Sequence, residues 1–198
     1  MNSIKKYFFT IISIVFLFYS CDKIEEPYLE PIGSHHPEPG EKVRKILLEE
    51  FTGHTCVNCP EGSANAKNLK TLYGEQLVLL SIHAGTNALP ESEPYNADFR
   101  TVTGTEINDY FTVSFYPGGI INQTKYNGLW TLPYTMWQEA IEEIIYLPPE
   151  AYIIIENDYN PSNRKLISTV IIEFLTDMEG TYNLCFYIAE SGIIAPQK

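Results

Sequence analysis

Positive charge is scarce in this sequence. Its 13 lysine and arginine residues face 25 aspartate and glutamate residues, so the formal net charge is −12. Without residues 1–20, which hold two lysines and no acidic residue, 11 basic and 25 acidic residues would remain, a net charge of −14. Nucleic-acid binding depends on lysine and arginine that neutralise phosphates, so the composition argues against a nucleic-acid partner. A solvated, self-repelling surface is the simplest interpretation of the acidic excess.

Long hydrophobic runs are also lacking. The N-terminal run Tyr7–Tyr19 has 13 residues, whereas a membrane-spanning helix needs about 20. Lys5-Lys6 precedes this run and Cys21 follows it, a pattern that resembles a bacterial lipoprotein signal. We therefore expect residues 1–20 to be a signal peptide and Cys21 to be the lipidated mature N-terminus. The alternative is an ordinary secretory signal with an incidental Cys21, and both interpretations predict export to a compartment where disulfides persist.

The remainder of the chain divides by composition. Residues 21–42 are rich in proline, glycine and glutamate and are expected to be a flexible tether. Within them His35-His36 is an isolated pair, from which no metal site is expected. Hydrophobic residues make up 44% of the chain, enough for a core in one domain or two small ones. Residues 43–147 are predicted to form the first folded unit and residues 150–198 a second region.

A pair of cysteines three residues apart organises the first unit. The apolar run Ile46–Leu48 indicates a buried strand within 44–51, and apolar spacing then predicts a helix over Cys56–Tyr73, with Thr55 as N-cap and Gly74 as C-cap. Cys56 would lie at the helix N-terminus, where the positive end of the helix dipole favours its thiolate. This arrangement is typical of thiol–disulfide exchange, with Cys56 and Cys59 as the catalytic pair.

Two histidines bear on this interpretation. His54, two residues before Cys56, could tune the thiol pKa as an imidazolium partner. His83 ends the next predicted strand, at the sheet edge where α/β proteins place their sites, and could do the same. The same residues leave two alternatives open: an inert structural disulfide, or a metal site using His54, Cys56 and Cys59. We expect neither a bound metal nor a cofactor.

The other elements of the first unit follow from periodicity and turn residues. Leu77–His83 is predicted to be a strand buried on both faces and parallel to the first strand through a right-handed crossover. The remaining predictions are a helix within Asp98–Phe111 with Ile107, Tyr110 and Phe111 on one face, a strand at Ile120–Asn122, its hairpin partner within Lys125–Trp130, and a helix over Pro133–Tyr146.

Strand, helix, strand, helix, hairpin and helix, with the cysteine pair after the first strand, is similar to the thioredoxin fold. The stretches FTGHTCVNCP and FYPGGIIN further resemble the thioredoxin-like domain of the outer membrane protein twenty-eight-related lipoproteins of Bacteroidetes, over residues 43–189. This resemblance implies an outer-membrane lipoprotein of the cell envelope, anchored by lipid, whose thioredoxin-like domain precedes a β-sandwich-like region. Its partners would be envelope client proteins or a redox partner.

The resemblance also implies roles for individual residues. Cys56 matches the exposed attacking cysteine, Cys59 the resolving one, and Pro117 the proline that is cis in thioredoxin folds. A cis Pro117 beside the cysteines would leave the backbone of Tyr116 free to pair with an extended substrate strand. Two features of thioredoxin itself are absent. His54-Thr55 stands where thioredoxin has a tryptophan before its first cysteine, and Val57-Asn58 stands in place of its Gly-Pro. The redox potential of thioredoxin therefore cannot be transferred.

Residues 150–198 change character. Tyr152–Asn157, Lys165–Leu175 and Thr181–Ala189 are β-branched or aromatic runs separated by turn residues, which predicts three antiparallel strands. Three strands are too few to close a sandwich, so the β-sandwich-like region is expected to be incomplete. Cys185 on the third strand is expected to be a buried small hydrophobe.

The sequence therefore predicts an exported, lipid-anchored protein that combines an α/β thioredoxin-like fold with thiol–disulfide oxidoreductase capability. The alternative is a cell-surface binding or adhesion lipoprotein in which the same fold is a scaffold and the Cys56–Cys59 pair a static disulfide. A metal-handling protein using His54 with the two cysteines is the third interpretation.

Overall fold

The fold was analysed in a computed structural model, which describes residues 40–198. The signal peptide predicted at residues 1–20, the lipidation site at Cys21, the pair His35-His36 and nearly all of the tether lie outside the described residues. Within residues 40–198, no helix has both the length and the apolar character needed to cross a membrane.

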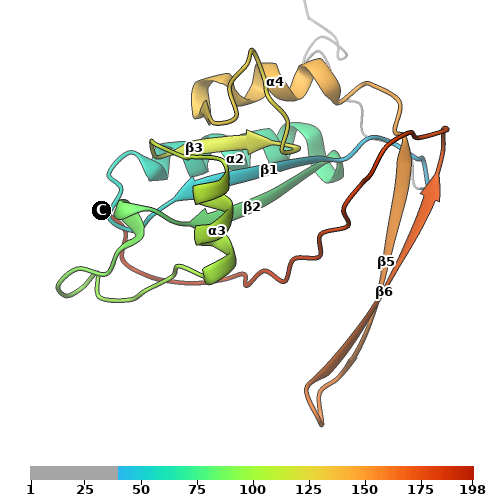
Figure 1. Cartoon of the computed structure of the whole chain (residues 1–198). Helices are drawn as coiled ribbons and strands as arrows, with labels where there is room; N and C mark the ends of the chain where they lie inside the picture. Colours follow the sequence, from blue (N-terminus) through green and yellow to red (C-terminus); the bar gives the residue numbers. More distant parts are fainter. Residues whose placement is uncertain (1–39) are drawn as a thin grey trace, which may run out of the picture. The chain divides into compact units, whose positions relative to one another are not determined.

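A four-stranded sheet forms the centre of the first unit (Figure 1). Its strands are β1 (Ile46–Thr52), β2 (Leu77–His83), β3 (Gly118–Ile121) and β4 (Leu132–Pro133), in the order β2-β1-β3-β4. As predicted, β1 and β2 are parallel, paired from Ile46 with Leu77 to Thr52 with His83. The strand β3 runs antiparallel to both β1 and β4.

The hairpin partner predicted within Lys125–Trp130 is wrong, because that segment turns back on itself. Tyr126 and Leu129 exchange two backbone hydrogen bonds of 2.9 Å, and Asn127 and Gly128 between them have φ values of 50° and 81°. These left-handed conformations close a tight turn and leave no extended run to pair with β3. The chain reaches the sheet only at β4, a few residues later.

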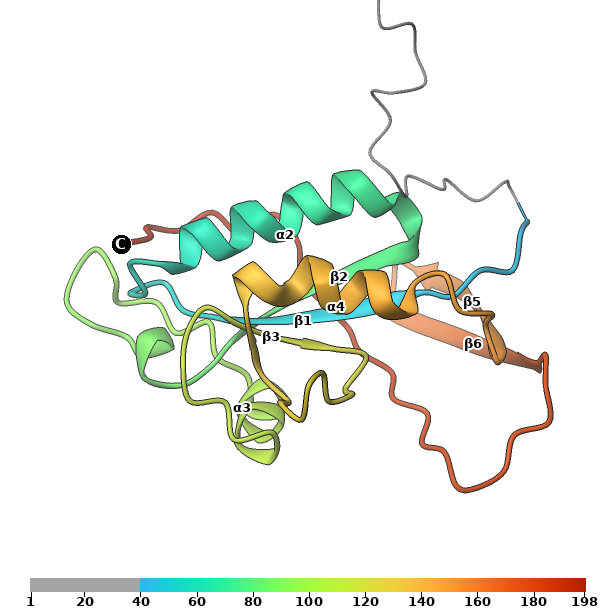
Figure 2. The same cartoon turned by 90° about the horizontal axis from the view of Figure 1, so that it is seen from above.

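Helices cover both faces of the sheet. α2 (Cys59–Tyr73) and α4 (Trp137–Ile144) lie on one side, as Figure 2 shows from above. α3 (Val102–Tyr110) lies on the other, where Thr101 Oγ1 accepts a hydrogen bond from the Gly104 amide and caps the helix. Three short 3₁₀ helices complete the unit: Gly74–Gln76, Thr86–Ala88 and Tyr134–Met136.

The two faces carry separate cores because side chains alternate along each strand. On the side of α2 and α4, Trp137 is fully buried and its indole Nε1 donates to the Leu132 carbonyl at 3.0 Å. On the side of α3, Phe51, Ile82 and Ile120 pack with Phe111. Tyr110, predicted to lie on one face with Ile107 and Phe111, is 80% exposed, whereas Phe111 is buried.

The prediction that Leu77–His83 is buried on both faces is wrong. Val78 is 47% exposed and Ser81 is exposed, because β2 is an edge strand of this sheet. The Pro148-Pro149 pair follows α4, and the chain then continues into a separate two-stranded sheet.

That second sheet consists of β5 (Ala151–Asn160) and β6 (Lys165–Phe174), paired antiparallel along their whole length. The third strand predicted at Thr181–Ala189 is not formed, and Cys185 is exposed rather than buried. Because no further strand or facing sheet within residues 40–198 covers the pair, apolar side chains such as Ile153 remain 53% exposed. The described part of this region is therefore a two-stranded β-ribbon, and the incomplete β-sandwich-like region stays a prediction.

Candidate functional site

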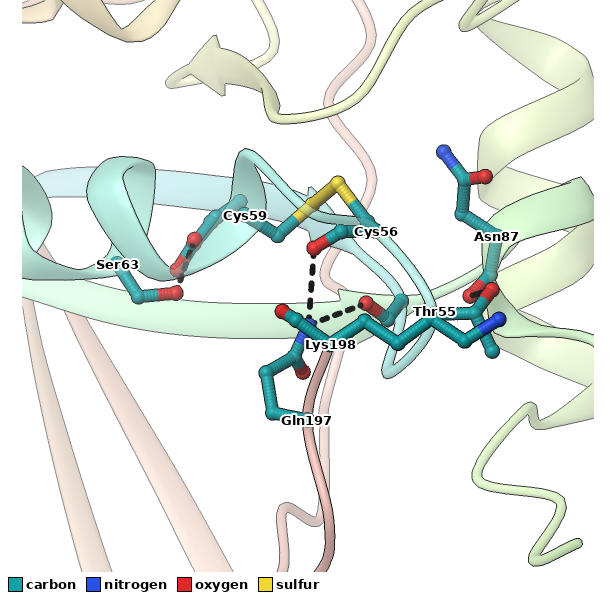
Figure 3. Close-up of a disulfide and its surroundings, with 9 residues drawn as sticks. Thr55, Cys56, Cys59, Ser63, Asn87, Gln197 and Lys198 are labelled. Atoms are coloured by element: carbon teal, nitrogen blue, oxygen red, sulfur yellow. Dashed lines mark hydrogen bonds between the residues drawn. A yellow bond between two sulfur atoms is a disulfide. The ribbon is translucent and has the colours of Figure 1, made fainter. Parts of the chain in front are cut away.

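The cysteine pair lies where the chain leaves the sheet and enters α2. β1 ends at Thr52, and a short connection leads to Cys59, the first residue of α2. Cys56 and Cys59 form a disulfide with their Cα atoms 5.4 Å apart (Figure 3). Both cysteines are nearly inaccessible, with exposed fractions of 4% and 1%. The exposed attacking cysteine implied by the resemblance is therefore not seen in this oxidised form.

The helix begins three residues later than predicted. Asn58 is the N-cap position, and Thr55 does not cap the helix, because its hydroxyl donates to the Asn87 carbonyl at 2.8 Å instead. The amide of Thr55 donates to the same carbonyl at 3.1 Å. Thr55 thus anchors the connection to the 3₁₀ helix at Thr86–Ala88, and Cys56 lies just ahead of the positive end of the α2 dipole.

Pro117 packs against the first turn of α2. The Tyr116–Pro117 peptide bond is cis, as the resemblance implied. A methyl group at Gly62, three residues beyond Cys59, would lie 2.7 Å from both Cβ and Cγ of Pro117. Only a residue without a side chain allows this approach, so the proline lies close to the helical turn that begins with the cysteine.

Tyr116 is held by its side chain. Its hydroxyl donates to Asn108 Oδ1 on α3 at 2.6 Å, and burial raises the pKa of the phenol. The ring passes so close to Gly85 that a methyl group there would lie 2.0 Å from the phenol oxygen. With a φ of 67°, Gly85 also needs the left-handed conformation that glycine adopts readily. These contacts fix the residue next to Pro117.

Glu50 is a site residue that the sequence analysis missed. This carboxylate is 4% exposed and accepts hydrogen bonds from the Ser63 hydroxyl of α2 at 2.6 Å and the Ser81 hydroxyl of β2 at 3.1 Å. Ser63 is four residues beyond Cys59 and so lies on the same face of α2. Burial raises the pKa of Glu50 above its usual value, and the two hydroxyl bonds and Lys67 only partly offset that effect. The signal was available in the sequence: two consecutive glutamates interrupt an otherwise apolar central strand.

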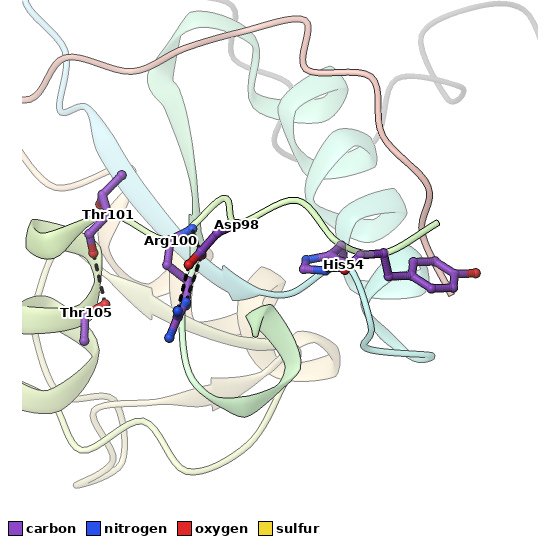
Figure 4. A network of polar contacts seen from close by, with 6 residues as sticks. His54, Asp98, Arg100, Thr101 and Thr105 are labelled. Carbon is purple, nitrogen blue, oxygen red and sulfur yellow. Dashed lines mark hydrogen bonds and ion pairs between the residues drawn. The ribbon is translucent and has the colours of Figure 1, made fainter. Parts of the chain in front are cut away.

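Neither ring nitrogen of His54 forms a hydrogen bond with the cysteines among residues 40–198. It is 2% exposed, its Nε2 donates to the Tyr95 carbonyl at 3.1 Å, and its Nδ1 has no partner among the described residues. Figure 4 shows the ring in this position. The His54 and Phe99 rings are nearly perpendicular, with their centroids 5.6 Å apart. His54 therefore holds the loop that follows β2 against the connection that precedes α2.

The His83 ring also packs against Phe99, with 5.4 Å between the ring centroids. Burial is the main cause that lowers the pKa of His83, and the nearby His54 lowers it further. In the same loop Arg100 bonds both oxygens of Asp98, at 2.9 and 2.7 Å, and holds the pKa of that carboxyl at about 2 (Figure 4). Among residues 40–198, no group of three or more histidine, cysteine or acidic side chains is arranged to hold a metal ion.

The arrangement of elements is thioredoxin-like: a strand, the cysteine pair, a helix, a parallel strand, a helix, an antiparallel hairpin and a final helix. No protein-family model matches the chain, and no curated protein matches it. Among solved structures, the chain is similar to the protein AGR_C_4864 from Agrobacterium tumefaciens, with 14% identity and a TM-score of 0.41 over 61% of this chain and 54% of that one. The chain thus spans about half the length of that protein. It is also similar to the germline-specific thioredoxin Deadhead of Drosophila melanogaster, with 14% identity and a TM-score of 0.33 over 51% of this chain and 82% of that one.

Proposed function

We propose that this protein is a thiol–disulfide oxidoreductase. The observation that carries the proposal is the Cys56–Cys59 disulfide at the start of α2, with Pro117 against the same helical turn. A cysteine ahead of a helix N-terminus is stabilised as the thiolate, the form that attacks disulfides. A second cysteine three residues on is within reach to displace whatever the first one binds.

The exchange proceeds in two steps, in which atoms and electrons balance. In the reduced protein, the Cys56 thiolate attacks one sulfur of a client disulfide, forms a Cys56–client bond and releases the other client sulfur as a thiolate. Cys59 then loses its proton, attacks Cys56, and releases the second client sulfur as a thiolate. The protein loses two electrons and the client gains them. The reverse sequence oxidises a client dithiol, and a partner dithiol or disulfide restores the starting state.

Glu50 is the group that takes the Cys59 proton in the second step. Its carboxylate lies beneath the face of α2 that carries Cys59, and a raised pKa brings it closer to that of a thiol. A proton acceptor whose pKa lies near that of its donor works best near neutral pH. Ser63 and Ser81 keep the carboxylate in place in both of its protonation states, because a hydroxyl can either donate or accept.

The site of action follows from the N-terminal sequence. The run that stops at Cys21 supports cleavage and lipidation there, and hence attachment to the outer membrane of the cell envelope. An oxidoreductase held there would meet folded envelope proteins as clients, together with a redox partner. The acidic net charge favours basic surfaces on those clients.

The second candidate is a binding or adhesion lipoprotein with a static disulfide. The specific observation in its favour is the burial of both sulfur-bearing residues, 4% and 1% exposed, which limits access by a client. A structural disulfide of this kind resists reduction and has a potential below about −300 mV.

One pair of measurements separates the candidates. The reduction potential of the Cys56–Cys59 pair is measured against glutathione, and we expect a value well above about −300 mV. In addition, Cys59→Ala should accumulate mixed disulfides with envelope proteins, whereas Cys56→Ala should trap far fewer. A potential below about −300 mV together with equal trapping by both variants would support the static scaffold instead.

A further inference from the structure

The connection that precedes α2 already binds an extended segment of the chain. The backbone amide of Lys198 donates to the His54 carbonyl at 3.0 Å. The side-chain amide of Gln197 donates to the carbonyls of Gly53 and Cys56, at 3.1 and 3.0 Å. Figure 3 shows Gln197 and Lys198 beside the disulfide, with the dashed bond to the Cys56 carbonyl. These carbonyls are acceptors that any extended peptide with an amide donor could use.

The Lys198 side chain enters a second part of the same surface. Its ammonium Nζ lies 2.5 Å from Glu91 Oε2 and 5.2 Å from the centroid of the Tyr95 ring. A carboxylate and an aromatic face together recognise a cation through charge and through the ring quadrupole. The position therefore selects for lysine or arginine and against an acidic residue.

These two parts are held together as one surface. The Glu91 amide donates to the Tyr95 carbonyl at 2.8 Å, which closes the loop that carries both residues. The same carbonyl accepts from His54 Nε2 at 3.1 Å, so His54 links that loop to the connection before α2. The buried His54 thus connects the two parts of this surface.

We propose that this surface is a recognition subsite for an extended, lysine-bearing segment of a client protein, and that Gln197-Lys198 occupies it in this structure. The subsite consists of the carbonyls of residues 53, 54 and 56 with the side chains of Glu91 and Tyr95. Because one carbonyl belongs to Cys56, residues next to the bound segment lie within a few residues' reach of the disulfide. The role in client selection rests on the proposed oxidoreductase function, but binding itself does not.

The chain's own segment must compete with any client. A tethered ligand acts at an effective concentration that reaches the millimolar range, so it masks a weak external peptide. Lys198→Ala removes both the ion pair and the contact with the Tyr95 ring and should vacate the part of the subsite formed by Glu91 and Tyr95. Glu91→Gln removes the charge from the subsite itself. Glu93→Gln is the matched control, because it removes a charge two residues away that bonds Asn96 instead.

The test measures binding of two cysteine-free peptides to the full chain by fluorescence anisotropy. The peptides are identical except for a Gln-Lys or a Gln-Glu pair. We expect Lys198→Ala to bind the lysine peptide more tightly than the unaltered chain does, and to prefer it over the glutamate peptide by about three- to ten-fold. Adding Glu91→Gln should abolish the preference, and adding Glu93→Gln should retain it.

Versions of the two peptides that carry a disulfide then test client selection. The ratio of their kcat/KM values should follow the binding preference and depend on Glu91 in the same way. Equal binding of the two peptides, or a preference that survives Glu91→Gln, would overturn the subsite and leave Gln197-Lys198 as a structural contact only. Selective binding without any exchange would refute the oxidoreductase function and, with it, the role in client selection, while the subsite itself would stand.

Discussion

Glu49 and Glu50 are neighbours in β1, both are buried, and their carboxylates lie on opposite faces of the sheet. Glu50 bonds Ser63 of α2, whereas Glu49 is fully buried and accepts from Gln123 Nε2 at 2.9 Å. The second oxygen of Glu49 has no hydrogen-bond partner within residues 40–198. Burial is the main reason that the pKa of each is raised. Only Glu50 lies on the side of the helix that begins with Cys59, so Glu49 is a matched control for the role proposed for Glu50.

Glu50→Gln should slow thiol–disulfide exchange about ten-fold or more at neutral pH, because no group remains to accept the Cys59 proton. The exchange rate should also lose the part of its pH dependence that comes from titration of this carboxylate. Rates are measured by stopped flow from pH 5 to 9 with a small disulfide as oxidant. Glu49→Gln is the matched control and should leave the pH profile unchanged. A similar loss in both variants would indicate a general effect of altering β1 and would contradict the role of Glu50.

The same two variants should change the pH dependence of stability. A raised folded-state pKa means that the folded protein binds more protons than the unfolded one between the ordinary value, about 4.5, and the folded value. The free energy of unfolding therefore falls as pH rises through that window and levels off above it. The total fall is about 1.4 kcal/mol for each unit by which folding raises the pKa. In each glutamine variant the free energy of unfolding should fall less between pH 4 and pH 8 than in the unaltered protein. Urea denaturation at the two pH values measures this difference. A wild-type curve parallel to both variants would contradict the raised values.

Gly62→Ala should destabilise the domain, although alanine is normally about 1 kcal/mol better than glycine inside a helix. The added methyl group would lie 2.7 Å from the Pro117 ring and would force α2 and the proline apart. We expect a net loss of about 1–3 kcal/mol by chemical denaturation, together with slower exchange. Asn68→Ala, on the exposed side of the same helix, should be close to neutral. A stabilised Gly62→Ala protein would mean that the helix and Pro117 are not in this tight contact.

Gly119→Ala should be more disruptive still. A methyl group there would lie 2.3 Å from the indole nitrogen of Trp137, which is fully buried beneath β3. We expect a loss of about 3 kcal/mol or more. Trp137→Phe should itself cost about 1–3 kcal/mol, because it leaves the Leu132 carbonyl without its partner. In the double variant the smaller ring makes room for the methyl group, so the two losses should sum to more than the measured effect.

The N-terminal prediction is tested by mass spectrometry of the membrane fraction. The mature protein should begin at Cys21 and carry acyl chains, and Cys21→Ser should release the protein from the membrane. Two acyl signals are needed for stable attachment, so a mass corresponding to several chains is expected. An unmodified Cys21, or cleavage at another residue, would support the ordinary secretory signal.

The sequence alone was enough to determine features that depend on near neighbours in the chain. The spacing of Cys56 and Cys59, the parallel crossover from β1 to β2, the position of β2 and the C-cap at Gly74 all follow from local pattern, and the structure has them as predicted. The predicted helix start and hairpin partner are wrong by a few residues. Thr55 and Tyr126 form hydrogen bonds that the local sequence pattern does not predict.

Only the tertiary structure decided what surrounds the cysteines. Glu50 meets Ser63 and Ser81 because the sheet brings β2 beside β1 and α2 across them, and no spacing within one element contains that information. His54 bonds a loop 41 residues away instead of the thiols, and Gln197 bonds Gly53 across 144 residues. A side chain's partner is set by where distant segments pack, whereas its place on a strand or helix is set by its immediate neighbours. For this reason the sequence identified the cysteine pair, and the fold identified the residues that surround it.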